Sequence, residues 1–255
     1  MSVNANSTAQ GHSQVSLKIL GFLLVVSFFA SISTIFYGLS VTHQAVAWPE
    51  ILLIAGSLSA IVTAPLASLG LWSRSKQGIE ETSFKQLLIK DKWLLSLFLA
   101  IVLGILCGIF VVLSDKAFYS FLPTAIQDME VPGSLPGLFA SLGAGINEEI
   151  GFRLGALTGL LGMGHWILKQ PQTSTVLFWA ANVVSALLFG AAHLPQFALM
   201  ASGLPFSLIG VVLLQNGVVG LTFGWLYWQW GLLAAVLAHI MADIVIHVLI
   251  PTFFS

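Results

Sequence analysis

The fold class is indicated by one stretch of sequence, WLLSLFLAIVLGILCGIFVVL, which runs from Trp93 to Leu113 and contains no charged residue. A helix of about 20 mostly apolar residues is long enough to cross the hydrocarbon core of a bilayer. Such a surface is unfavourable in water, so the stretch predicts a transmembrane helix.

The composition extends this prediction to the whole chain. Of the 255 residues, 57% are hydrophobic and 7% are charged, whereas about a quarter of the residues of a soluble domain are charged. Seven segments have roughly the length of a spanning helix: Ser16–Tyr37, Trp48–Trp72, Trp93–Leu113, Leu135–Met163, Ser174–His193, Pro205–Trp228 and Leu232–Phe253. We therefore expect an all-α fold, a polytopic transmembrane helix bundle with about seven spanning helices and a range of about six to eight.

Three parts follow one another along the chain. Residues 1–15 are polar and are expected to be disordered, residues 16–134 hold the N-terminal transmembrane helices, and residues 135–253 hold the remaining spans. The first apolar run is longer than the roughly 7–15-residue core of a cleaved signal peptide, so we expect a retained helix. The segment Leu135–Met163 is long for a single span, and we expect it to be tilted or broken at its glycines.

Basic residues near the helix ends predict the orientation. Five of the nine Lys and Arg residues lie in one connection or at the next helix start: Arg74, Lys76, Lys85, Lys90 and Lys92. The connection from Ser40 to Ala47 has none. We expect a cytoplasmic N-terminus, with the membrane being the inner membrane of a bacterium. Seven spans would place the carboxyl terminus outside.

Charge and cysteine content exclude several other classes. The net charge is -1 and there is no basic tract, so nucleic acid is not an expected partner. The single cysteine, Cys107, rules out a disulfide within the chain and a cysteine-based zinc site. Membrane lipid is the partner that the composition predicts, and the sequence does not indicate an oligomeric state.

Ionisable side chains within the apolar spans are the candidate functional residues. They are Glu148, Glu149, Arg153, His193, His239, Asp243 and His247. A charge at the bilayer centre costs about 2.5–3.5 kcal/mol on insertion scales, so these groups should face the bundle interior. Three different helices carry them, and converging polar stripes would form a hydrated cavity within the membrane.

Each residue also has a simpler interpretation. Glu149 and Arg153 are four residues apart and could be a structural ion pair. His193 and His247, taken singly, could be interfacial or structural histidines, and Asn147 and Asn182 could be interhelical hydrogen-bonding groups. Glu148 differs, because it projects about 100° around the helix from Glu149 and has no partner in its own helix.

Three motifs lie in order on successive apolar helices. Residues 147–153, NEEIGFR, contain EExxxR; residues 189–193, FGAAH, match FxxxH; and residues 239–243, HIMAD, match HxxxB. Over roughly residues 135–253 the chain thus resembles the CPBP family of intramembrane proteases, which joins type II CAAX prenyl endopeptidases with bacterial Abi and bacteriocin-immunity proteins. Leu154 stands where glycine commonly follows the arginine, and Asp243 replaces the commoner asparagine.

The resemblance implies an intramembrane endopeptidase that hydrolyses a peptide bond of a membrane-associated protein or peptide. It implies that Glu148 and His193 activate a water molecule and that His239, with Asp243, stabilises the oxyanion. Glu149 and Arg153 would hold the motif helix in register, although the two glutamates could exchange roles. No cofactor is expected. Zinc is the less favoured alternative, since the sequence has no HExxH motif.

Two other classes remain open at this point. The first is a non-catalytic membrane protein that acts by binding, such as an immunity protein. The second is a proton-coupled carrier, because intramembrane Glu, His and Asp residues also build proton relays. A carrier would be expected to have broken helices or inverted halves, and the sequence has no internal repeat. The sequence does not reveal the substrate.

Overall fold

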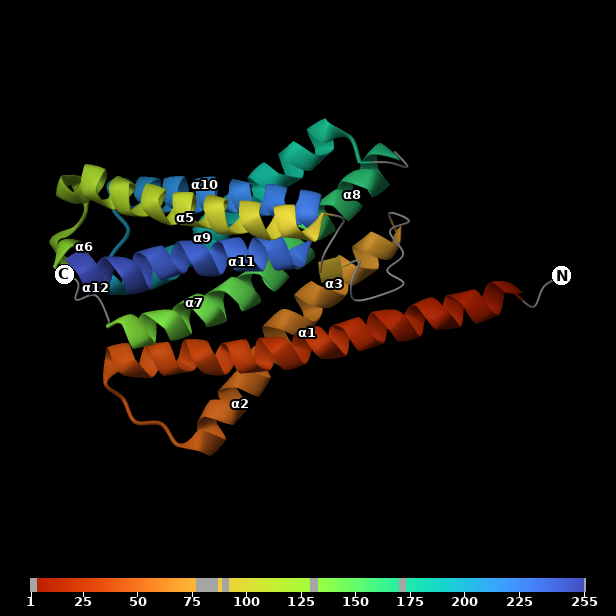
Figure 1. Cartoon of the computed structure of the whole chain (residues 1–255), viewed down its shortest axis with the longest axis horizontal. Helices are drawn as coiled ribbons and strands as arrows, with labels where there is room; N and C mark the ends of the chain where they lie inside the picture. The colour runs from red at the N-terminus through yellow and green to blue at the C-terminus, as the bar shows by residue number, and fades with distance from the viewer. Residues whose placement is uncertain (1–3, 77–86, 89–91, 129–132, 170–172, 255) are drawn as a thin grey trace.

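The computed structural model describes the backbone of residues 4–76, 87–88, 92–128, 133–169 and 173–254, which is helical over almost its whole length and contains no strand. The elements are α1 (Asn4–Thr42), α2 (Trp48–Leu58), η1 (Ser59–Thr63), α3 (Ala64–Lys76), α5 (Trp93–Phe118), η2 (Tyr119–Phe121), α6 (Thr124–Gln127), α7 (Ser134–Glu149), η3 (Ile150–Leu157), α8 (Thr158–Leu168), α9 (Thr175–Met200), α10 (Phe206–Trp230), α11 (Leu232–Ile244), η4 (Val245–Leu249) and α12 (Ile250–Phe254). Figure 1 shows the long helices gathered into one bundle.

Six helical runs in the described part of the chain are long and apolar enough to cross a membrane: Ser16–Thr42, Trp48–Ser75, Trp93–Phe121, Thr175–Met200, Phe206–Trp230 and Leu232–Phe253. They correspond to six of the seven predicted spans. The prediction of a polytopic helical bundle with six to eight spans is therefore confirmed.

The remaining predicted span is the continuous helical run from Ser134 to Leu168, formed by α7, η3 and α8. It is not among the six, and it contains three charged residues, Glu148, Glu149 and Arg153. The run is not broken at its glycines; it contains instead the π-helix η3, which includes Gly151 and Gly155.

The two ends of the described chain lie at opposite ends of the bundle (Figure 1). This arrangement agrees with an odd number of crossings. Helix α1 begins at Asn4, within residues 1–15, for which the sequence predicts disorder. This disorder stays a prediction. Two residues of the basic connection, Lys85 and Lys90, lie outside the described residues.

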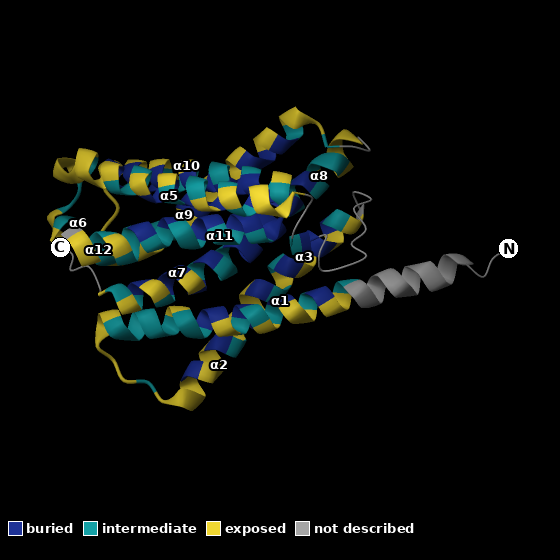
Figure 2. Ribbon diagram, viewed as in Figure 1, coloured by how far each residue is buried: buried dark blue, intermediate teal, exposed yellow. Residues whose placement is uncertain are grey.

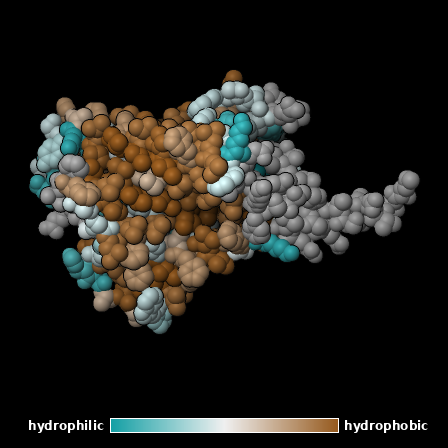
Figure 3. Space-filling view, viewed as in Figure 1, coloured by the Kyte–Doolittle hydropathy of each residue, from teal (hydrophilic) through white to brown (hydrophobic). Residues whose placement is uncertain are grey.

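The surface is that of a protein embedded in lipid. Figure 3 shows a broad hydrophobic band over the middle of the bundle, with hydrophilic residues near its ends. Figure 2 shows exposed positions spread along the outer faces of the spanning helices. Leu53, Ile61 and Phe98 are among the large apolar side chains that are more than half exposed. Lipid is the environment in which such an apolar surface is stable.

Helix α11 lies between α5 and α7, and glycines allow its close approach to both. A Cβ atom on Gly104 of α5 would collide with the carbonyl oxygen of Ala238, and one on Gly108 would lie 2.7 Å from the carbonyl oxygen of Ala242. On the other side, a Cβ on Gly145 of α7 would lie 2.5 Å from Cγ1 of Ile240. These contacts fix the part of α11 that carries His239 and Asp243.

Candidate active site

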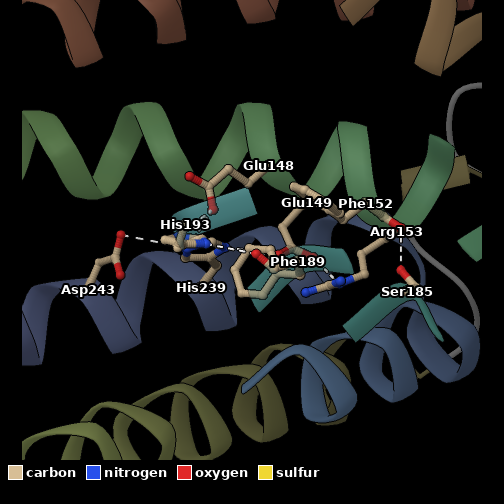
Figure 4. Close-up of polar contacts among 9 residues, drawn as sticks. All are labelled: Glu148, Glu149, Phe152, Arg153, Ser185, Phe189, His193, His239 and Asp243. Atoms are coloured by element: carbon tan, nitrogen blue, oxygen red, sulfur yellow. Dashed lines mark hydrogen bonds and ion pairs between the residues drawn. The ribbon is translucent and has the colours of Figure 1, made fainter. Parts of the chain in front are cut away.

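The residues predicted from the sequence come together inside the bundle (Figure 4). Four elements supply them: the end of α7, η3, α9 and α11. The six residues are Glu148 and Glu149 (α7), Arg153 (η3), His193 (α9), and His239 and Asp243 (α11). The expected convergence of polar stripes from three helices is therefore present in the structure.

One half of the cluster is fully buried. The Glu149 and Arg153 side chains have no exposed area, and Glu149 Oε2 lies 3.0 Å from Arg153 Nε. The other oxygen, Oε1, lies 2.9 Å from Nδ1 of His239. Because a carboxylate accepts hydrogen bonds, Nδ1–H of His239 donates this bond. Glu149 thus forms an ion pair with Arg153 and orients the His239 ring at the same time.

The other half of the cluster is partly accessible, although Oε2 of Glu148 is itself buried. The Glu148 side chain is 30% exposed and the His193 side chain is 25% exposed. Glu148 Oε2 lies 3.8 Å from Nε2 of His193 and 3.9 Å from Nε2 of His239. Asp243 Oδ2 lies 3.7 Å from the same His239 nitrogen. These separations exceed a direct hydrogen bond and are within the span that a bridging water covers.

The orientation of His193 is fixed by the backbone of its own helix. Its Nδ1 lies 2.8 Å from the carbonyl oxygen of Phe189. A carbonyl oxygen can only accept a hydrogen bond, so Nδ1 carries the proton and is the donor. In a neutral ring, Nε2 then has a free lone pair, and this is the nitrogen that lies nearest to Glu148.

Aromatic rings surround the buried histidine. The Phe189 ring centre lies 5.9 Å from that of His239 and 4.9 Å from that of His193. The guanidinium carbon of Arg153 lies 5.0 Å from the same phenylalanine ring, a cation–π arrangement. Phe223 covers His239 from α10 with 5.2 Å between ring centres. Both phenylalanines are buried, so they shield His239 from solvent on these sides.

The π-helix η3 starts directly after Glu149, at Ile150, and includes the motif arginine, Arg153. Two hydroxyl groups donate to its backbone carbonyls. Thr158 Oγ1 donates to the carbonyl oxygen of Arg153 at 3.0 Å, and Ser185 Oγ of α9 donates to that of Phe152 at 3.0 Å. Short π-helical segments frequently occur at functional sites. The Ser185 bond ties η3 to the helix that carries His193.

Several features were not identified from the sequence. One is the role of Glu149, whose carboxylate accepts the hydrogen bond from Nδ1–H of His239 and so orients this ring. The shielding role of Phe223 was also missed, because its partner lies on another helix.

Asn182 donates to the carbonyl oxygen of Leu221 at 3.0 Å, the interhelical role expected of it. His247 packs near Tyr37, with 6.5 Å between ring centres.

The described residues contain no group of three or more His, Cys, Asp or Glu side chains arranged to hold a metal ion. Independence from a metal stays a prediction, since only an activity measurement can test it.

Comparison with known sequences places these residues in a recognised domain. Residues 131–245 match the sequence model of the Rce1-like family, described as type II CAAX prenyl endopeptidase Rce1-like. The matched segment includes all six residues of the cluster. The chain matches no curated protein and no solved structure. The resemblance inferred from the three motifs is thus confirmed by an independent comparison.

Proposed function

We propose that the protein is an integral membrane protease whose active site is the cluster around Glu148, because residues 131–245 match the Rce1-like family model and contain this cluster. The substrate we propose is a membrane-associated protein or peptide, whose peptide bond is hydrolysed by a water molecule that Glu148 and His193 activate. We call Glu148, His193 and His239 the catalytic cluster.

The observation that carries this proposal is the position of the Glu148 carboxylate. It lies at nearly equal distances, 3.8 and 3.9 Å, from Nε2 of His193 and Nε2 of His239. Glu149 is completely buried, paired with Arg153 and hydrogen-bonded to His239, so it is poorly placed to meet water or substrate. This difference supports Glu148 as the base, of the two glutamates that the sequence left interchangeable.

The first step is proton transfer from water. A water molecule between Glu148 and His193 would donate one proton to the carboxylate and a hydrogen bond to Nε2 of His193. The resulting hydroxide attacks the carbonyl carbon of the scissile peptide bond. The carbonyl electrons move to oxygen and form a tetrahedral oxyanion.

The second step requires stabilisation of that oxyanion and a proton for the leaving amine. With a proton on Nε2, His239 would donate a hydrogen bond to the oxyanion, and Glu149 on Nδ1 would hold the ring in place. Glu148 then returns its proton to the amine nitrogen as the C–N bond breaks. Asp243, 3.7 Å from Nε2 of His239, would stabilise the positive charge of a doubly protonated ring.

We propose that this mechanism needs no metal ion. Treating an active preparation with a chelator should leave the cleavage rate unchanged, and metal analysis of the treated sample should show less than one ion per protein. A loss of activity that added zinc restores would contradict a metal-independent reaction.

The orientation proposed from the basic residues is a cytoplasmic N-terminus in a bacterial inner membrane. Arg74, Lys92 and Lys169 support it, because the end of α3, the start of α5 and the end of α8 lie at the end of the bundle where α1 begins (Figure 1). Short loops rich in Lys and Arg remain on the cytoplasmic side.

The proposal is tested by substituting each residue of the catalytic cluster. Glu148→Gln should reduce kcat/KM by about 10²–10⁴-fold, the usual contribution of a general base. His239→Ala should cost about 10²–10³-fold if it stabilises the oxyanion, and His193→Ala should also be strongly impaired. Substrates are first captured with Glu148→Gln, and their cleavage ends are then mapped by mass spectrometry in membranes that contain the wild type.

The matched control is His247→Ala, a histidine on the continuation of α11 that lies outside the catalytic cluster. It should keep wild-type activity, and all variants should accumulate in the membrane and elute as folded protein in detergent. Full activity of purified Glu148→Gln would exclude the proposed mechanism.

A further inference from the structure

A second polar cluster lies beside the first, on the opposite side of α7. Ser27 Oγ of α1 donates a hydrogen bond to Asn147 Oδ1 at 2.7 Å. The Asn147 amide group, Nδ2, donates to Ser31 Oγ at 3.1 Å. Ser27 and Ser31 are both buried. Both ends of the amide are therefore held by α1, and Asn147 cannot rotate without breaking a bond.

The same cluster continues into η1. Ser27 Oγ lies 2.8 Å from Oγ1 of Thr63, and Ser59 Oγ donates to Ser27 Oγ at 3.4 Å. Ser59 and Thr63 are buried as well. Polar groups that meet between transmembrane helices have few alternative partners in lipid, so they fix how the helices lie against each other. Helices α1 and α7 and the π-helix η1 are thus joined at one position.

This position is directly next to Glu148 in the sequence. Among the described residues, no hydrogen bond reaches Oε2 of Glu148, so the location of this carboxylate depends on the backbone of α7. On one side of Glu148, Glu149 is bonded to His239 and paired with Arg153. On the other side, Asn147 is bonded to α1. The backbone at Glu148 is held between these two attachments.

We propose that Asn147 is a positioning residue, which sets the distance between Glu148 and His193 through its two hydrogen bonds to Ser27 and Ser31. Helix α1 lies outside the matched segment 131–245. The N-terminal half of the chain therefore contributes to the active site by holding α7, without supplying a catalytic group. A displacement of about 1 Å at a reacting group can cost about 10²-fold in rate.

A second α1–α7 hydrogen bond provides a matched control. Ser33 Oγ donates to the carbonyl oxygen of Phe139 at 2.8 Å, in the same helix pair and about two turns from Asn147. If the polar contacts serve only to pack α1 on α7, Ser33→Ala and Ser27→Ala should affect the enzyme alike. If Asn147 positions Glu148, only the bonds to Asn147 should affect the rate of the chemical step.

The test measures kcat and KM, per folded molecule of full-length protein, on a substrate captured with Glu148→Gln, and it rests on the proposed function. Asn147→Leu keeps the size of the side chain and removes both bonds. Its kcat should fall by roughly 10–100-fold with KM within about twofold of the wild type. Ser27→Ala and Ser31→Ala should give smaller losses, and the double variant should match Asn147→Leu.

Adding Asn147→Leu to the double serine variant should cause no further loss of kcat, because the same two bonds are already absent. Ser33→Ala should keep the wild-type kcat, whatever its effect on thermal stability. If Asn147→Leu does not accumulate, the two single serine variants, which leave the amide in place, decide the question. A wild-type kcat in them, or an equal loss in Ser33→Ala, would overturn the proposal. A wild-type enzyme that cleaves no captured substrate would instead contradict the proposed function.

Discussion

At the scale of single residues, the two adjacent glutamates have different surroundings. Glu149 is fully buried, paired with Arg153 and bonded to His239. Glu148 is 30% exposed and faces two histidine nitrogens. The sequence indicates that their side chains point about 100° apart. The sequence does not indicate which of the two side chains is buried, because this depends on the helices that pack on either side of α7.

The buried pair should be important for stability as well as activity. Arg153→Met should lower the free energy of unfolding by about 3–5 kcal/mol, because it leaves the Glu149 charge buried without its cationic partner. The measurement is the thermal unfolding midpoint of detergent-solubilised protein at a fixed scan rate.

The matched comparison for Arg153→Met is Glu148→Gln, which also alters the charge of the cluster. Glu148 is partly exposed and its Oε2 accepts no hydrogen bond from the described residues. The unfolding midpoint of Glu148→Gln should therefore stay close to that of the wild type. An unchanged midpoint for Arg153→Met would mean that Glu149 is neutral in the folded protein.

At the scale of the helices, the site depends on the close approach of α5 to α11. Gly104→Ala places a Cβ against the backbone of Ala238, one residue before His239. Overpacking of this kind costs about 1–3 kcal/mol, which exceeds the gain of about 1 kcal/mol in helix propensity. The unfolding midpoint should fall, and activity should fall with it if α11 moves.

Gly217→Ala on α10 is the control, since nothing lies within 4 Å of a Cβ at this position. It should leave the midpoint unchanged or raise it. An equal decrease in the two variants would show that the α5–α11 approach is not especially tight.

Hydropathy predicted the positions of the helices, but it did not predict where the helical geometry changes within them. Long uncharged runs such as Trp93–Leu113 correspond to helices, because a membrane requires the backbone to satisfy its own hydrogen bonds. The π-helix η3 was not predicted. Its geometry depends partly on hydroxyl groups such as Ser185, which reaches Phe152 from another helix. Contacts between distant segments leave no periodic signal in the sequence.

At the scale of the whole molecule, the proposed orientation can be tested independently of catalysis. In a Cys107→Ser background, Gln44→Cys should react with a membrane-impermeant maleimide in intact cells. Ser75→Cys should react only after the membrane is permeabilised. Both positions are exposed and lie at opposite ends of the bundle. The reverse pattern would place the N-terminus outside.

The sequence predicted which residues meet at the site, but it did not predict what holds them. Motif spacing and the cost of charges in lipid pointed to Glu148, His193 and His239. The attachment of Asn147 to Ser27 and Ser31 could not be inferred, because serines are common in apolar helices and their partners lie more than 100 residues away in the chain. The sequence alone therefore does not show which side chains pair between different helices.

The charged run Ser134–Leu168 also has a consequence for biogenesis. A growing chain enters the bilayer segment by segment, and each charge at mid-depth costs about 2.5–3.5 kcal/mol at that moment. Glu149 and Arg153 emerge together and can neutralise each other, whereas His239 is synthesised 90 residues after Glu149. Helix α1, already inserted, offers Ser27 and Ser31 to the arriving segment. The earliest helix would then serve as an assembly template for the least apolar one.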